Sequence, residues 1–131
     1  MSHKVVIVGS RSFPIDTVVG TQIVELMRAF PEDTLFLTRG SDGFDRFVMQ
    51  VAPIIGRHCF AYPASGGADN YLRDIELVKD GDEVLAFFDP GTLDDSQSGT
   101  AHVVEKALDQ GKTVRAYSVV NEALIWVGEN D

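Results

Sequence analysis

The feature that most constrains the fold is an alternation of short apolar runs with longer amphipathic segments. The first run, residues 5–8, is β-branched throughout and ends at Gly9, which is typical of a strand buried on both faces of a sheet. Residues 16–30 follow with apolar side chains at helical spacing, and Asp16 is the expected N-cap. Strands that alternate with helices predict right-handed crossovers and a parallel sheet covered on both faces.

The rest of the chain repeats this pattern. Further strands are predicted at 34–38, 58–63, 83–88 and 113–120, and further helices at 44–55, 70–78 and 99–109. We therefore expect one Rossmann-like α/β domain of three layers with a mostly parallel, five-stranded sheet. It would span residues 1–131, with its core at about 4–117. The apolar tail, 118–131, would either cover a sheet edge or form a subunit contact in a homo-oligomer.

Charge and cysteine content exclude several classes of protein. The formal net charge of -9 repels nucleic acid and anionic membrane surfaces, so neither is an expected partner. The single cysteine, Cys59, lies in an apolar run and is expected to be a small buried side chain rather than a reactive thiol. The apolar run at the N-terminus is too short for a signal peptide or a membrane span, and we expect a cytoplasmic protein.

Three strand ends carry glycine and hydroxyl residues, at 9–13, 39–45 and 98–100. Small residues let backbone N–H groups approach an oxygen, and a helix start adds positive partial charge. In an open α/β sheet, ligands bind beyond the carboxyl ends of the strands, at the switch in strand order. Taken singly, each loop is more typical of a turn or a helix cap. Together they predict one cleft for a phosphate-bearing ligand.

Arginine placement supports that cleft. Arg11 and Arg39 fall in two of these loops, and Arg73 lies in the helix before the fourth strand. A guanidinium binds phosphate through two parallel hydrogen bonds, although each arginine could equally pair with one of the 20 acidic residues.

In this order, the motifs VVIVGSRSF, TRGSDGFD, LRDIELV, DEVLAFFD and SGTAHVVEKALDQGKTV resemble the SLOG superfamily of Rossmann-like nucleotide-binding domains. They are most similar to its small YspA-like members, over residues 4–117. Arg39 and Phe44 replace a glycine and a small residue of the family's second loop, which implies a reshaped pocket. The resemblance and the loops together predict these ligand-binding residues: Gly9, Ser10, Arg11, Arg39, Gly40, Ser41, Gly43, Asp45, Arg73, Ser98, Gly99 and Thr100.

The relatives differ in activity. Lonely Guy phosphoribohydrolases carry a catalytic glutamate three residues after the threonine of their last loop, where this chain has Val103. Glu105 should point away, about 200° around the helix from Val103. Other relatives are antiphage sensors of signals such as cyclic ADP-ribose, and DNA-processing proteins, which the acidic charge disfavours here. The sequence leaves open whether this chain is an enzyme.

Three functions therefore compete. The first is binding of a nucleotide-derived molecule (ADP-ribose-like or a nucleoside phosphate), as a sensor or a sequestering protein that requires no cofactor. Phe13 or Phe44 would then stack on a base or serve the core. The second is nucleotide hydrolysis, with Asp45 as a weak candidate base and Mg²⁺ held by carboxylates. Those carboxylates are Asp42, Asp45, Asp89, Asp94 and Asp95. The third is an interaction protein that assembles through its tail. The histidines are too scattered for a metal site, and His102 is a further candidate for ligand contact.

Overall fold

The computed structural model describes residues 3–63, 68–89, 99–120 and 123–129. In this part of the chain, six strands form one sheet in the order β3-β2-β1-β4-β5-β6. The strands are β1 (Lys4–Gly9), β2 (Leu35–Thr38), β3 (His58–Ala61), β4 (Glu83–Phe87), β5 (Thr113–Val120) and β6 (Ala123–Glu129). The first five are parallel, and β6 pairs antiparallel with β5. The predicted mostly parallel sheet is confirmed, but its count of five strands is one too few.

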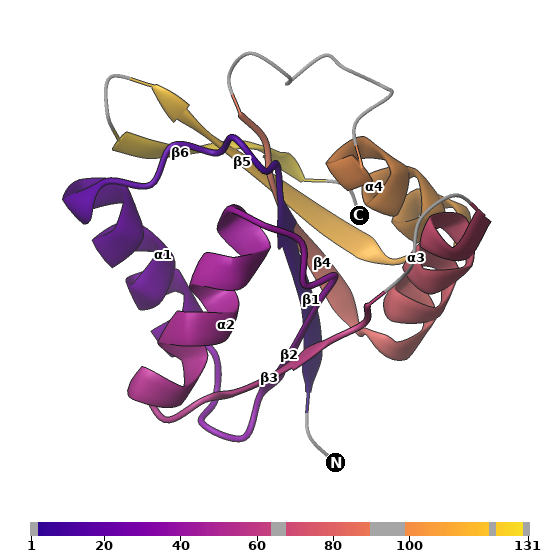
Figure 1. The fold of residues 1–131 in the computed structure, drawn as a ribbon, viewed down its shortest axis with the longest axis horizontal. Helices are drawn as coiled ribbons and strands as arrows, with labels where there is room; N and C mark the ends of the chain where they lie inside the picture. Colours follow the sequence, from indigo (N-terminus) through magenta and orange to yellow (C-terminus); the bar gives the residue numbers. More distant parts are fainter. Residues whose placement is uncertain (1–2, 64–67, 90–98, 121–122, 130–131) are drawn as a thin grey trace.

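Helices cover both faces of the sheet, which gives the three predicted layers (Figure 1). Helices α1 (Thr17–Arg28) and α2 (Phe44–Ile54) lie on one face. On the other face lie α3 (Ala68–Asp80) and α4 (Gly99–Asp109). Predicted and observed boundaries agree to within about two residues at most ends, which is the usual uncertainty of a helix end.

The first strand is buried on both sides, as its β-branched run predicts. Val5 and Ile7 pack in the apolar cluster under α1 and α2, whereas Val6 and Val8 pack in the cluster under α3 and α4. All four side chains are fully buried. This strand therefore holds both layers together and places Gly9 at the centre of the sheet's carboxyl edge.

The tail covers a sheet edge, one of its two predicted roles. Strand β6 pairs with β5 along most of its length, and Leu124 packs against the core cluster under α1 and α2. The backbone N–H of Leu124 donates to Gln22 Oε1 of α1 at 2.8 Å. Trp126 stays largely exposed, at 61%. The extra strand explains the discrepancy in strand count.

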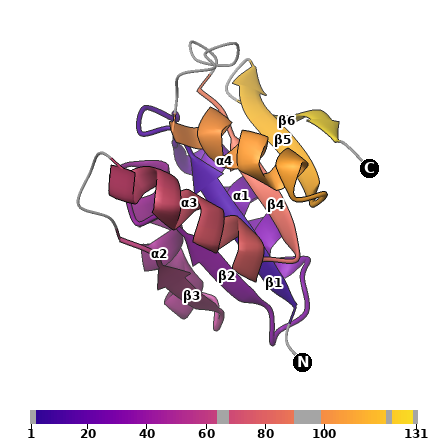
Figure 2. The ribbon, with the colours of Figure 1, turned by 90° about the vertical axis from the view of Figure 1, so that its right-hand side faces the viewer.

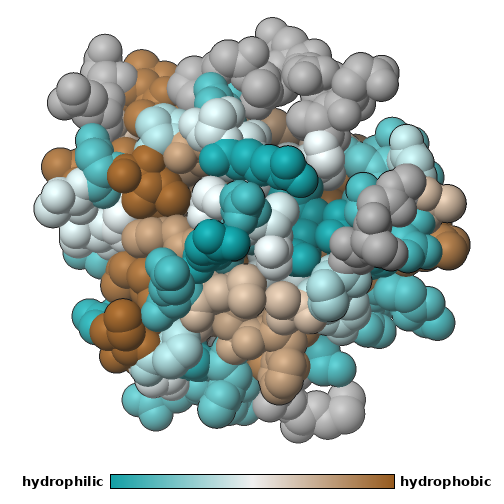
Figure 3. Space-filling model, viewed as in Figure 1, coloured by the Kyte–Doolittle hydropathy of each residue, from teal (hydrophilic) through white to brown (hydrophobic). Residues whose placement is uncertain are grey.

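No helix in the described ranges has both the length and the apolar character that a membrane crossing requires. On the face that Figure 3 draws, hydrophobic side chains lie in separate groups at the left and lower centre, with hydrophilic side chains between them.

Candidate functional site

The predicted loops meet at the carboxyl edge of the sheet. Strand β1 lies between β2 and β4, so the carboxyl ends of these three strands are neighbours. Strands β2 and β3 lie on one side of β1, and β4, β5 and β6 lie on its other side. The strand order therefore switches between β1 and β4. Helices α3 and α4 lie side by side on one face (Figure 2). This is where a parallel α/β sheet can hold a ligand.

A buried carboxylate, Asp45, joins the first two loops. Its Oδ1 accepts the Gly9 N–H at 3.1 Å, and its Oδ2 accepts the Ser41 hydroxyl at 2.6 Å. The same Oδ2 accepts Arg39 Nε at 3.1 Å and, more weakly, the Ser41 N–H at 3.4 Å. The side chain of Asp45 is fully buried, and that of Arg39 is 6% exposed. The pair is therefore an internal ion pair, which is one of the two alternatives that the sequence left open for Arg39.

The same arginine extends this network to the third loop. Arg39 Nη2 donates to the Gly9 carbonyl at 2.6 Å and to Thr100 Oγ1 at 3.2 Å. Thr100 is 1% exposed and lies in the first turn of α4. One guanidinium thus links the end of β1, the start of α2 and the start of α4. We call these residues, Gly9, Arg39, Ser41, Asp45 and Thr100, the closed network.

Three of the predicted glycines serve close packing in this region. A Cβ on Gly99 would lie 2.7 Å from Arg39 Nη1, and a Cβ on Gly9 would lie 2.3 Å from the Phe44 ring. Gly43 has φ +79°, and a Cβ there would lie 2.1 Å from the Arg11 carbonyl oxygen. The sequence suggested that glycines admit a phosphate, but the structure places protein atoms in all three spaces.

The remaining loop residues differ in what they contact. The Ser10 N–H donates to the Phe87 carbonyl at 3.0 Å, and Ser10 Oγ accepts the Asp89 N–H at 3.3 Å. Gly40 has φ +81° and lies two residues after the end of β2. Arg11 is exposed, and its side chain makes no polar contact among the described residues. Ser98 lies outside the described residues.

The carboxylates proposed for hydrolysis are differently placed. Asp45 is enclosed by four donors, and this geometry favours its role as a structural partner of Arg39 over that of a base. Asp42 has a side chain that is 72% exposed and pairs with Arg46 at 2.6 Å. Asp94 and Asp95 lie outside the described residues. Within those residues, no group of three or more His, Cys, Asp or Glu side chains is arranged to hold a metal ion.

The two phenylalanines belong to the core. Phe44 is fully buried and stacks on Phe87 with ring centroids 4.4 Å apart. Phe13 is 5% exposed and packs edge-on against both rings. Of the two roles that the sequence left open, base stacking is wrong for this structure. The large ring of Phe44 fills the space beside Gly9.

A second carboxylate-centred cluster joins α3 to α4. Asp74 Oδ1 accepts Arg73 Nε at 2.8 Å, and Asp74 Oδ2 bonds His102 Nδ1 at 2.6 Å. Asp74 is 2% exposed. We call Arg73, Asp74 and His102 the open cluster, because the side chains of Arg73 and His102 are partly exposed. Asp74 was not predicted as a site residue, although its sequence carries a signal. It precedes Leu77 and Val78 at the spacing of one helix face, so an acidic residue occupies an apolar stripe.

Two further predictions concern single residues. Val103, where the resemblance led us to look for a catalytic glutamate, is fully buried, whereas the side chain of Glu105 is 63% exposed. Burial and, to a lesser extent, the charge of Asp45 raise the pKa of Cys59 to about 12. A thiol with such a pKa is a poor nucleophile, as expected from its apolar context.

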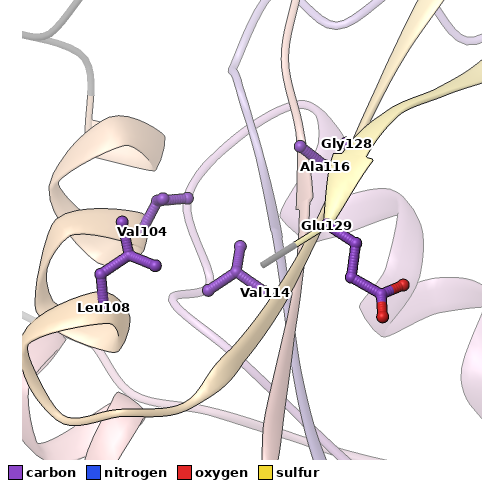
Figure 4. Close-up of a pocket in the computed structure, with 6 residues that line it drawn as sticks. All are labelled: Val104, Leu108, Val114, Ala116, Gly128 and Glu129. Atoms are coloured by element: carbon purple, nitrogen blue, oxygen red, sulfur yellow. The ribbon is translucent and has the colours of Figure 1, made fainter. Parts of the chain in front are cut away.

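A small hollow lies away from this edge, between α4 and the last two strands (Figure 4). Its lining is mainly aliphatic: Val104, Leu108, Val114, Ala116, Gly128 and Glu129. Its volume of about 160 Å³ is smaller than the roughly 300–1,000 Å³ of typical small-molecule sites. None of the predicted ligand-binding residues lines it, so it does not serve as the predicted cleft.

Comparison with known proteins identifies the fold. No protein-family model and no curated protein matches the chain. The X-ray structure of TM1055, a structural genomics target, matches it with a TM-score of 0.63 and 21% sequence identity. The match covers 86% of this chain and 72% of that chain. At this level of identity the likeness shows a shared Rossmann-like α/β fold.

Proposed function

We propose that this protein binds a nucleotide-derived small molecule, ADP-ribose-like or a nucleoside phosphate, at the carboxyl edge of its sheet. The resemblance to the SLOG superfamily is part of this proposal. The observation that carries it is the meeting of three loops at the switch in strand order, where Arg39 joins Gly9 to Thr100. A rigid, pre-formed rim of this kind is what small-ligand sites in open α/β sheets share.

The contacts to the ligand differ from those that the sequence suggested. The amides of Gly9 and Ser41 donate to Asp45, and the amide of Ser10 donates to Phe87, so these three groups support the rim. Arg11 is exposed and makes no side-chain ion pair among the described residues. We therefore expect Arg11, together with the start of α4, to contact the phosphates.

These observations favour ligand binding over hydrolysis. A general base needs a lone pair that faces the reacting proton, and both oxygens of Asp45 already accept hydrogen bonds from the protein. Asp42 is a solvated partner of Arg46. The function proposed is therefore that of a sensor or sequestering domain.

Isothermal titration calorimetry with AMP and ADP-ribose tests the proposal. Arg11→Ala should weaken binding about tenfold, which is the usual effect of removing one charged hydrogen bond. The matched control is Arg28→Ala, which removes the same charge from an exposed position at the last turn of α1, at the other edge of the sheet. Absence of binding at millimolar nucleotide, or equal losses in the two variants, would contradict the proposal.

A further inference from the structure

The apolar hollow beside α4 lies apart from the predicted ligand-binding residues. It has a volume of about 160 Å³ and lies between α4 and the last two strands. Figure 4 shows the helix on one side of it and the strands on the other. Helix α4 contributes Val104 and Leu108, and β5 contributes Val114 and Ala116. The hollow is therefore a separate feature of the sheet face that α3 and α4 cover.

Small residues on the two strands keep this space open. Gly128 of β6 lies opposite Ala116 of β5, and a Cβ added to Gly128 would meet no atom within 4 Å. The apolar surface continues at the edge of the hollow, because Leu108 is 48% exposed. An apolar side chain that enters the hollow removes aliphatic surface from water, which is favourable.

The surface of α4 beside the hollow is acidic. Glu105 and Asp109 each follow a lining residue by one position, so they lie about 100° further around the helix. Their side chains are 63% and 64% exposed. Lys106 Nζ lies 3.7 Å from Glu105 Oε1 and 3.8 Å from Asp109 Oδ2, and such long, solvated contacts hold charges only weakly. Both carboxylates can therefore pair with a cation from outside the chain.

Size and charge select among the possible occupants of the hollow. It is smaller than typical small-molecule sites, whereas an apolar space of about 150 Å³ holds a group as large as benzene. A second copy of this chain would bring its own net charge of -9 and the same acidic helix surface, so like charges would oppose each other. A segment with one large apolar side chain between lysines or arginines matches both the size and the charge.

We propose that the hollow is a docking site for another protein, and that it receives one leucine- or phenylalanine-sized side chain from a basic segment. The apolar side chain fills the space beside Gly128, and the flanking cations pair with Glu105 and Asp109. Side chains that anchor protein interfaces fill desolvated pockets in this way. The inference is independent of the proposed nucleotide site, because none of the predicted ligand-binding residues lines the hollow.

The probe is a synthetic peptide, capped at both ends, with one leucine between pairs of lysines. Amide NMR spectra of the isotope-labelled protein are recorded while the peptide is added up to millimolar concentration. The signals of Leu108 and Gly128 should shift, whereas those of Gly40 and Ser41 at the carboxyl edge of the sheet should not. A peptide with glycine in place of leucine, and one with glutamates in place of the lysines, should each bind at least about fivefold more weakly.

Two variants separate the apolar anchor from the charge. Gly128→Leu places a side chain of the protein itself in the hollow, so it should weaken binding of the lysine peptide about tenfold at an unchanged urea midpoint. Glu105→Lys should weaken binding about fivefold. Glu25→Lys is the matched control, because it changes the net charge equally at an exposed position of α1, on the other face of the sheet, and it should have little effect.

Four results would overturn the inference. If Glu105→Lys and Glu25→Lys weaken binding equally, the peptide responds only to the overall charge of the protein. If wild-type protein and Gly128→Leu bind the peptide equally, the hollow receives no anchor, and the absence of any shift at millimolar peptide has the same meaning. A concentration-dependent dimer that Gly128→Leu abolishes, measured by sedimentation, would show that a second copy occupies the hollow instead.

Discussion

The closed network and the open cluster lie at the same edge of the sheet and use the same chemistry, an aspartate that holds an arginine. They differ in what the arginine does with its remaining nitrogens. Arg39 Nη2 donates to Gly9 and Thr100, whereas Arg73 donates from Nη1 to the Tyr62 carbonyl at a longer 3.5 Å. The same two residue types therefore make different contacts in the two places.

Burial separates the two pairs in energetic terms as well. Asp45 is fully buried and Arg39 nearly so, and removal of one partner leaves the other charge without compensation in the interior. In the open cluster Arg73 and His102 reach water, which can solvate a charge that loses its partner. The closed network should thus contribute more to stability than the open cluster does.

The largest effect is expected from Asp45→Ala. This change leaves the Arg39 guanidinium and the Gly9 N–H without their acceptor, so we expect a loss of about 3–5 kcal/mol in the free energy of unfolding. Urea denaturation followed by circular dichroism measures it. Asp42→Ala is the control, because its exposed pair with Arg46 should contribute at most about 0.5 kcal/mol. A loss below 1 kcal/mol for Asp45→Ala would show that the network is not structural.

A smaller effect is expected from Gly99→Ala. The added Cβ would lie 2.7 Å from Arg39 Nη1, so the buried guanidinium must shift from its place in the closed network, at a cost of about 1–3 kcal/mol. Gly128→Ala is the matched control, because a Cβ there meets no atom within 4 Å. The free energies of unfolding of both variants check this. If the two variants are equally stable, Gly99 is not required for the packing of Arg39.

Asp74→Asn should have a weaker effect than Asp45→Ala. The amide keeps the shape of the carboxylate but gives up its charge, and water reaches both partners, so we expect about 1–2 kcal/mol. The same urea titrations measure it. If Asp74→Asn destabilises the protein as much as Asp45→Ala does, the closed network does not contribute more to stability than the open cluster.

The periodicity of the sequence was sufficient to predict most of the fold. The β-branched run at 5–8 and the glycine after it predicted a central buried strand, and Asp16 was predicted as an N-cap and is one, since it accepts the Val19 N–H at 2.8 Å. Strand β6 was missed because the tail pairs with β5 at the edge of the sheet, and no local pattern distinguishes that from a subunit contact.

The candidate site was harder to predict, because its main contacts join residues that are far apart in the sequence. The sequence placed Gly9, Arg39 and Thr100 in converging loops, and the structure brings them together. It could not tell that Phe44 would pack against Gly9 or that Asp45 would accept the Gly9 N–H. Pairing of Asp74 with His102 joins residues 28 positions apart, and only packing of α3 against α4 determines it.

The smallest effect concerns Cys59, which reports on the closed network from β3. Burial and the charge of Asp45 raise its pKa to about 12, so at pH 8 only about one thiol in 10,000 is ionised, against roughly one in four for an unperturbed cysteine. A raised pKa lowers the thiolate fraction, so iodoacetamide should alkylate the native protein at least about 100-fold more slowly than the urea-unfolded chain. Mass spectrometry of timed samples measures both rates. Asp45→Asn removes one of the two causes and should speed alkylation several-fold. Rapid alkylation of the native wild-type protein would contradict the raised pKa of this thiol.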